Sequence, residues 1–211
     1  MKLHYFMIIG SMAAACSAAM LSIQKLKGSL KRSEKTTVIG AALLSGLFLG
    51  IRIYELYFLY TDWFRFILSL ALLNYASVID WKTHKIPNMV SGLMLAAAVC
   101  ADVVDCFSGR PSAGAWILSS LIAAFIVFIF FVFCRLVSKG GIGFGDIKLV
   151  TVLALICGFR GIIYVLVFSE ISALFAAAAG LLLKKMSLRD GLPFAPFFMV
   201  GFIITVALGM I

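Results

Sequence analysis

Between two strongly apolar runs the chain reads Gly140-Gly141-Ile142-Gly143-Phe144-Gly145-Asp146-Ile147-Lys148-Leu149. Four of the first six residues are glycine, and each glycine costs a helix about 1 kcal/mol relative to alanine. Glycine also lets the backbone approach another chain closely and permits a positive φ. The single carboxylate, Asp146, is a candidate functional residue, because ionisable residues inside membrane proteins rarely lack a role. The alternative is a flexible loop with a solvated aspartate. A second carboxylate, Asp80, ends an earlier apolar run and favours the functional interpretation.

The composition is that of a membrane protein. Hydrophobic residues make up 64% of the 211 positions and charged residues 13%, whereas soluble domains are about 45–50% apolar and 25% charged. The apolar residues form long runs and not the short alternating segments of a membrane β-barrel. We therefore expect an all-α, polytopic bundle of transmembrane helices. The net charge of +9 comes from basic residues in short loops, which indicates topology and contact with anionic lipid head groups rather than a nucleic-acid partner.

We expect about eight spans, an N-terminal pair followed by six more. The first apolar run, from Tyr5 to Ile23, lacks a clear basic n-region and is long enough to span, so we interpret it as a retained helix. A 13-residue basic loop, Lys25 to Thr37, follows. The predicted helices cover residues 5–24, 38–54, 64–79, 88–104, 113–137, 147–157, 162–183 and Pro193 to the C-terminus. The sixth is shorter than the roughly 20 residues of a full span, which is compatible with a glycine stretch that dips into the membrane.

Positive charge is distributed unevenly between the two sets of loops. Of the 18 Lys and Arg residues, 13 lie in or beside the loops that follow the first, third, fifth and seventh predicted helices. The positive-inside rule makes these loops cytoplasmic and places both termini on the other side. Two predicted helices, an even number of crossings, separate Asp80 from Asp146. Both carboxylates are therefore expected at the cytoplasmic face.

Two carboxylates at one membrane face can act together on a water molecule. Carboxyl groups within hydrogen-bond reach share a proton, so the ionised partner takes a proton from water while the protonated partner polarises a carbonyl group. This is the chemistry of aspartic proteases. The alternative is that Asp80 and Asp146 are unrelated residues at helix ends, each a cap or solvated.

The sequence predicts no metal and no cofactor. Its five cysteines form no CxxC pair, and it contains only two histidines, His4 and His84. Neither a zinc site nor a redox pair is supported by these spacings.

Two motifs resemble those of the type 4 prepilin peptidase family. Gly143-Phe144-Gly145-Asp146 is similar to the GxGD motif of membrane aspartic peptidases, and Asp80 stands six residues before Ile86-Pro87-Asn88, like the family's other aspartate motif. The run Pro193-Phe194-Ala195-Pro196-Phe197 resembles the family's final helix, although Ala195 stands where a glycine is common. The resemblance covers roughly residues 64–211.

The resemblance implies a six-helix aspartic peptidase core over residues 64–211, preceded by a helical pair over 1–63. It implies an endopeptidase that cleaves leader peptides of type 4 prepilin-like (pseudopilin) precursors, which carry a short basic leader before an apolar helix. The expected location is the cytoplasmic face of the bacterial inner membrane. The catalytic pair would be Asp80 and Asp146. Active-site support is expected from Gly143, Gly145, Lys148, Pro87 and Asn88, with Lys148 either stabilising the charge of Asp146 or anchoring its helix to lipid.

The chain departs from the larger bacterial members in one respect. Those members carry an insertion with two CxxC pairs after the first helix and also N-methylate the new N-terminus, whereas the loop here has no cysteine. We therefore expect a short form without methyl transfer.

Two alternatives remain open. One is an intramembrane protease of the presenilin or signal-peptide-peptidase kind, and the other is an ion-coupled transporter without enzymatic activity. In the first, the partner aspartate usually follows a tyrosine, whereas here Ile79 precedes Asp80. The second would be supported by interrupted helices in two matching halves, and the sequence shows only one interrupted region. Glu170 is expected either to face the bundle or to bond to a polar group such as Thr205.

Overall fold

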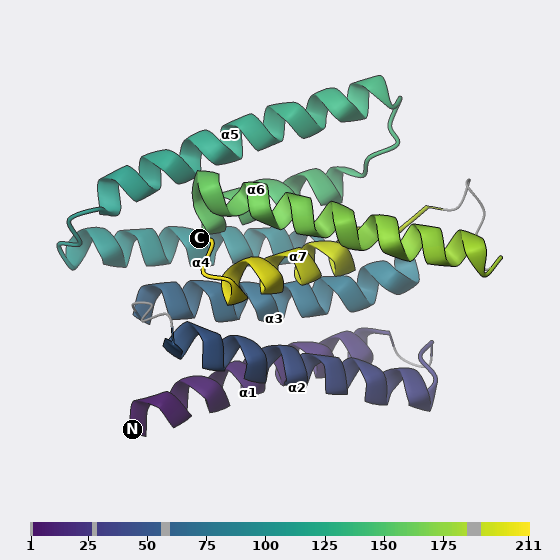
Figure 1. The fold of residues 1–211 in the computed structure, drawn as a ribbon, viewed down its shortest axis with the longest axis horizontal. Helices are drawn as coiled ribbons and strands as arrows, with labels where there is room; N and C mark the ends of the chain where they lie inside the picture. The colour runs from purple at the N-terminus through teal and green to yellow at the C-terminus, as the bar shows by residue number, and fades with distance from the viewer. Residues whose placement is uncertain (1, 27–28, 56–59, 185–190) are drawn as a thin grey trace.

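The computed structural model describes residues 2–26, 29–55, 60–184 and 191–211, and every regular element in these ranges is an α-helix (Figure 1). The helices are α1 (Lys2–Lys25), α2 (Arg32–Glu55), α3 (Tyr60–Thr83), α4 (Asn88–Phe107), α5 (Ala113–Val137), α6 (Phe144–Leu182) and α7 (Ala195–Ala207). The first six are long and apolar enough to cross a membrane, and α7 is a shorter apolar helix. The predicted all-α, polytopic architecture is confirmed.

The predicted sixth and seventh helices form one element, α6, that bends sharply at Gly158. This residue has φ 68° and ψ −178°, a combination that essentially only glycine adopts. Figure 1 shows the chain reversing its direction within α6, so that its second part runs back along the bundle. The bend falls between the predicted helix limits at 157 and 162, and the described residues therefore form eight helical segments in seven elements.

Several helices extend beyond the apolar runs from which they were predicted. α2 begins at Arg32, so the basic loop is shorter than 13 residues, and α3 continues to Thr83, which puts Asp80 inside the helix and not at its end. The reason is that Arg, Lys and Glu are good helix formers, and hydropathy detects only the apolar part of a helix. The start of α2 is also capped, because Oε2 of Glu34 accepts the backbone N–H of Lys31 at 2.8 Å. Three basic residues of the predicted loops, Lys27, Lys185 and Arg189, lie outside the described residues.

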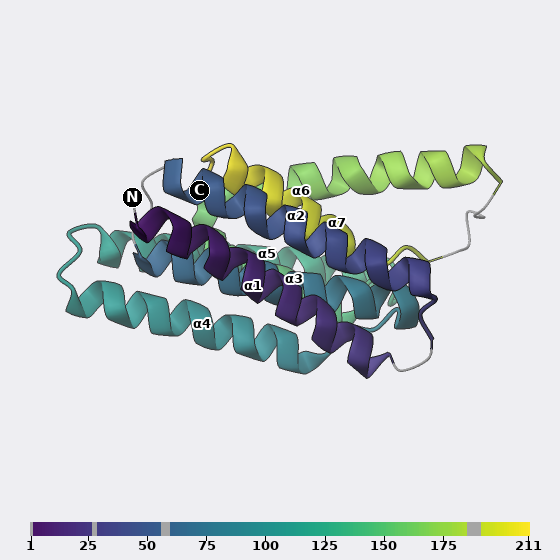
Figure 2. The ribbon, with the colours of Figure 1, turned by 90° about the horizontal axis from the view of Figure 1, so that it is seen from below.

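Helix α3 lies between the α1–α2 pair and the remaining helices (Figure 1). Leu70 and Leu73 on this helix are fully buried. The ring of Phe66 meets that of Phe202 on α7 edge to face, with centroids 6.1 Å apart. In the turned view of Figure 2, α4 and the second part of α6 lie on opposite sides of the bundle. The core is therefore built around α3, the helix that carries Asp80.

The helices alternate in direction. At one end of the bundle in Figure 1, α1, α3 and α5 end while α2, α4, α6 and α7 begin. We call this the loop end. Helix α1 begins and α7 ends at the opposite end. The chain thus returns to the same end after every second crossing, as the sequence predicts.

A network of buried ion pairs holds the opposite end of the bundle together. Nη2 of the fully buried Arg65 lies 2.7 Å from Oδ1 of Asp102 and 3.4 Å from Oδ2 of Asp105. Nη1 of Arg110 lies 3.1 Å from Oδ2 of Asp105 and 3.3 Å from Oδ1 of Asp62. The network joins the start of α3 to the end of α4 and the turn before α5. Removing one partner from such a group leaves a buried charge uncompensated, at a cost of about 3–5 kcal/mol.

Candidate active site

Asp80 projects from α3 onto the start of α7. Its side chain is buried, with 4% of the residue exposed, and Oδ2 accepts the backbone N–H of Ala195 at 3.1 Å. Ala195 is the first residue of α7, and the first N–H groups of a helix have no partner within it. A carboxylate is the favourable partner for these groups because the helix dipole is positive there. This hydrogen bond therefore fixes the start of α7 and the Asp80 carboxyl group relative to each other.

Asp146 lies in the first turn of α6, three residues after the N-cap, Gly143. Its carboxyl group interacts with the backbone N–H of Gly143, as the third-position side chain does in a capping box. A Cβ atom added at Gly143 would lie 2.8 Å from Oδ2 of Asp146. The glycine therefore leaves the space in which the Asp146 carboxyl group lies.

The structure brings Asp80 and Asp146 together at the loop end. The two carboxyl groups are close enough to interact electrostatically, although they lie far apart in the sequence. One comes from the last turns of α3 and the other from the first turn of α6. Each faces a backbone N–H at the start of a helix. Carboxyl groups that lie within hydrogen-bond reach of one water molecule can share a proton and act on that water.

The two sequence motifs also contact each other away from the carboxyl groups. A Cβ atom added at Gly145 would lie 3.1 Å from Cβ of Ile86 and 3.5 Å from the Ile86 carbonyl oxygen. Pro87 is the N-cap of α4, with φ −65° and ψ 131°. Nζ of Lys148 donates to Oδ1 of Asn88 at 3.1 Å. The contact observed for Lys148 is with Asn88 and not with Asp146, and the side chain joins the start of α6 to the start of α4.

Two residues near the aspartates were missed by the sequence analysis. Nη1 of Arg135 on α5 donates to the carbonyl oxygen of Ile142, and its guanidinium group lies 4.3 Å from the centroid of the Phe144 ring. Arg135 thus holds the end of the glycine stretch. His84 has φ 49° and interacts electrostatically with Asp80. The sequence alone does not reveal these contacts, because they cross between elements.

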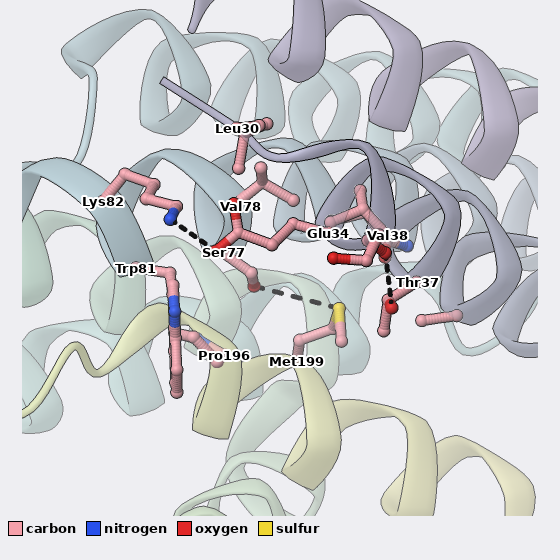
Figure 3. A pocket seen from close by; sticks show the side chains of 13 residues that line it. Leu30, Glu34, Thr37, Val38, Ser77, Val78, Trp81, Lys82, Pro196 and Met199 are labelled. Carbon is pink, nitrogen blue, oxygen red and sulfur yellow. Dashed lines mark hydrogen bonds and ion pairs between the residues drawn. The ribbon is translucent and has the colours of Figure 1, made fainter. Parts of the chain in front are cut away.

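A pocket of about 380 Å³ lies beside Asp80, between α2, α3 and α7 (Figure 3). Ser77 and Trp81, on either side of Asp80 in sequence, line it together with Pro196, the residue after Ala195. At its rim Nζ of Lys82 lies 2.8 Å from Oε1 of Glu34 on α2, as Figure 3 shows. Helix α2 of the N-terminal pair therefore contributes one wall of this pocket.

Glu170 does not belong to this site. It is exposed on the second part of α6, so it does not face the bundle as one alternative had it. The hydroxyl group of Thr205, its suggested partner, is buried and donates to the carbonyl oxygen of Gly201 at 2.8 Å. Among the residues that the structure describes, no group of three or more His, Cys, Asp or Glu side chains is arranged to hold a metal ion.

The fold and the site define a class of protein: a polytopic helical membrane protein in which two aspartates from separate helices interact electrostatically at one end. The model of the type IV leader peptidase family matches residues 67–211, and the chain belongs to this family. It is 27% identical over 146 residues to the prepilin leader peptidase/N-methyltransferase of Bacillus subtilis (strain 168), covering 69% of this chain and 56% of that protein. It is 30% identical over 134 residues to proteins of the same name from Burkholderia pseudomallei strains 1026b and K96243, covering 62% of this chain and 42% of theirs. The chain spans about half the length of these relatives. No solved structure matches it.

Proposed function

We propose that this chain is a membrane-embedded aspartic endopeptidase that removes leader peptides from type 4 prepilin-like precursors. The observation that carries the proposal is the electrostatic interaction of Asp80 with Asp146, one from each motif, at the loop end of the bundle. The family supports peptidase chemistry, and the names of the relatives supply the substrate class, prepilin leaders.

In the proposed reaction the two carboxyl groups share one proton and hold a water molecule between them. The ionised carboxylate takes a proton from the water, whose oxygen attacks the scissile carbonyl carbon, while the protonated carboxyl group donates to the carbonyl oxygen. The C–N bond then breaks as the amide nitrogen takes up a proton, which releases a new amino terminus and a new carboxylate. No covalent intermediate with the enzyme is needed.

The neighbouring residues support this pair in distinct ways. Gly143 leaves room for the Asp146 carboxyl group, and Gly145 allows the start of α6 to pack on Ile86. Pro87 and Asn88 begin α4 beside them. Lys148 ties Asn88 to α6. We propose that these contacts hold the start of α6 against the segment that follows α3, and that the shared proton depends on this placement.

We propose that the loop end faces the cytoplasm of a bacterial inner membrane. The basic residues that the described part of the chain carries between α1 and α2, between α3 and α4, and between α5 and α6 all lie at this end (Figure 1). The positive-inside rule assigns such an end to the cytoplasm. Leader peptides would then be cleaved on the side where precursors are made.

We further propose that residues 64–211 form the catalytic core and that the α1–α2 pair is an accessory module. Glu34, Thr37 and Val38 of α2 line the pocket beside Asp80. The pair is therefore placed to influence which precursors reach the aspartates.

The test is cleavage of a pilin-like precursor by the purified chain in detergent or nanodiscs. We expect Asp80→Asn and Asp146→Asn each to abolish cleavage while membrane insertion stays normal, since the reaction needs both an ionised and a protonated carboxyl group. Glu170→Gln is the matched control, because it removes an exposed carboxylate on a membrane helix and should leave activity unchanged. Substantial cleavage by either aspartate variant would contradict the assignment of Asp80 and Asp146 as the catalytic pair.

A further inference from the structure

A second cavity, of about 570 Å³, lies between α1, α3 and α4, and neither Asp80 nor Asp146 lines it. We call it the α1–α4 groove. Over most of its length its walls are apolar and include Ala14, Leu72 and Leu93. Toward the loop end, where α1 ends, the groove is lined by the polar side chains of Gln24, Lys25 and Tyr75. The groove is thus amphipathic along its axis.

The length of the groove matches one leaflet of a bilayer. Ala14 and Lys25 both line it and lie on the same helix, so at a rise of 1.5 Å per residue they are about 16 Å apart along α1. The hydrocarbon core of a bilayer is about 30 Å thick. A chain that lies in the groove with its polar group at Lys25 therefore extends from the head-group level to about the middle of the membrane.

The polar end of the groove is positively charged without an acidic partner. Nζ of Lys25 lies 5.7 Å from the centroid of the Tyr75 ring, and Lys25 forms no ion pair within the described ranges. By contrast, Lys82 in the pocket beside Asp80 is paired with Glu34 at 2.8 Å. The groove is also lined by Met89 and Val90 in the first turn of α4, whose N-terminus carries partial positive charge. The occupant that complements this end is an anion.

We propose that the α1–α4 groove binds one acyl chain of an anionic phospholipid, with the phosphate of the head group at Lys25 and the N-terminus of α4. A second copy of the chain is disfavoured as the occupant, because it would bring its own basic residues to Lys25. The proposal stands on the groove alone and does not depend on the peptidase activity, since no residue of the candidate active site lines the groove.

The experiment is native mass spectrometry of the protein released from nanodiscs that contain equal amounts of phosphatidylglycerol and phosphatidylethanolamine with identical acyl chains. The wild-type chain should retain phosphatidylglycerol preferentially. Lys25→Gln should lower this preference about fivefold, the effect of one lysine near a lipid surface, whereas Lys25→Arg should keep it. Lys35→Gln, which removes a partly exposed lysine of the same end outside the groove, should change little.

A second variant tests the apolar part of the groove. Ser17 lines the cavity but is exposed, so Ser17→Phe should fill the groove without disturbing the core and should lower retention of both lipids. Thermal unfolding of each variant checks that the fold is intact. Equal retention of the two lipids by the wild type would overturn the proposal, as would a Lys35→Gln effect equal to that of Lys25→Gln. Normal lipid retention by Ser17→Phe would show that the groove holds no acyl chain.

Discussion

Nζ of Lys148 lies 3.1 Å from Oδ1 of Asn88, and this hydrogen bond joins the start of α6 to the start of α4. Lys148 follows Asp146 by two residues, and Asn88 ends the Ile86-Pro87-Asn88 element. Gly145 and Ile86 pack against each other between the same two segments of the chain. The two motifs therefore contact each other in addition to supplying one carboxyl group each, and we expect Lys148 to influence the site through Asn88.

We predict that Lys148→Met and Asn88→Ala each lower kcat/KM for precursor cleavage by up to about tenfold. A hydrogen bond with one charged partner contributes about 1.5–3 kcal/mol, and this pair is exposed, so the lower value applies. Because each change breaks the same bond, the double variant should be no worse than the more severe single one. Lys148→Arg should retain most of the activity. Additive losses in the double variant would show that the two residues act separately.

We predict that valine at Gly143 or Gly145 lowers activity by at least about 100-fold. A Cβ at Gly143 meets the Asp146 carboxyl group, and one at Gly145 meets Ile86, so the first change displaces that carboxyl group and the second moves the start of α6 away from Ile86. The control is Gly40→Val, because nothing lies within 4 Å of a Cβ at that site. Gly46 is unsuitable as a control, since its Cβ would lie 2.8 Å from the Ser11 carbonyl oxygen. Equal activity of all three variants, at equal expression, would mean that the glycines serve only as linkers.

Much of the architecture was predictable because a membrane-spanning helix requires a long run of apolar residues, which the sequence shows directly. The limits of α5 were predicted correctly, and the bend at Gly158 falls where the sequence places a break. The arrival of Asp80 and Asp146 at one end needed only a count of crossings, since each span reverses the chain. Helix limits in polar sequence were less accurate: α2 begins several residues earlier than expected, at Arg32.

The contacts that shape the site could not be predicted, because they depend on how the helices pack. Asp80 accepts a hydrogen bond from the backbone N–H of Ala195, and Arg135 donates one to the carbonyl oxygen of Ile142. A pattern of side chains in the sequence does not predict hydrogen bonds to backbone groups of distant segments. The ion pair between Glu34 and Lys82 joins helices on either side of the pocket. Sequence spacing identified the two aspartates, and tertiary packing determined which groups surround them.

We predict that cleavage survives treatment with EDTA and that no methyl group is transferred to the product. The proposed reaction uses only two carboxyl groups and water, and the sequence has no cysteine pair with metal-ligand spacing. The assay follows cleavage after dialysis against the chelator and, separately, incorporation of radiolabel from a methyl donor into the cleaved product. Loss of activity that zinc restores, or labelled product, would contradict the respective half of the prediction.

The final prediction concerns Gly158, at which α6 reverses direction. Its φ of 68° and ψ of −178° are nearly inaccessible to other residues and cost them about 1–3 kcal/mol. A Cβ atom there would also lie 3.3 Å from Cη2 of Trp116 on α5. Gly158→Ala should therefore lower the free energy of unfolding by at least about 1 kcal/mol. Gly114→Ala is the matched control, because this helical glycine of α5 has nothing within 4 Å of a Cβ and alanine favours helix by about 1 kcal/mol. Both variants would be unfolded in mixed micelles of rising denaturing-detergent content. Opposite shifts are expected, and equal stability of the two variants would mean that the reversal does not depend on glycine.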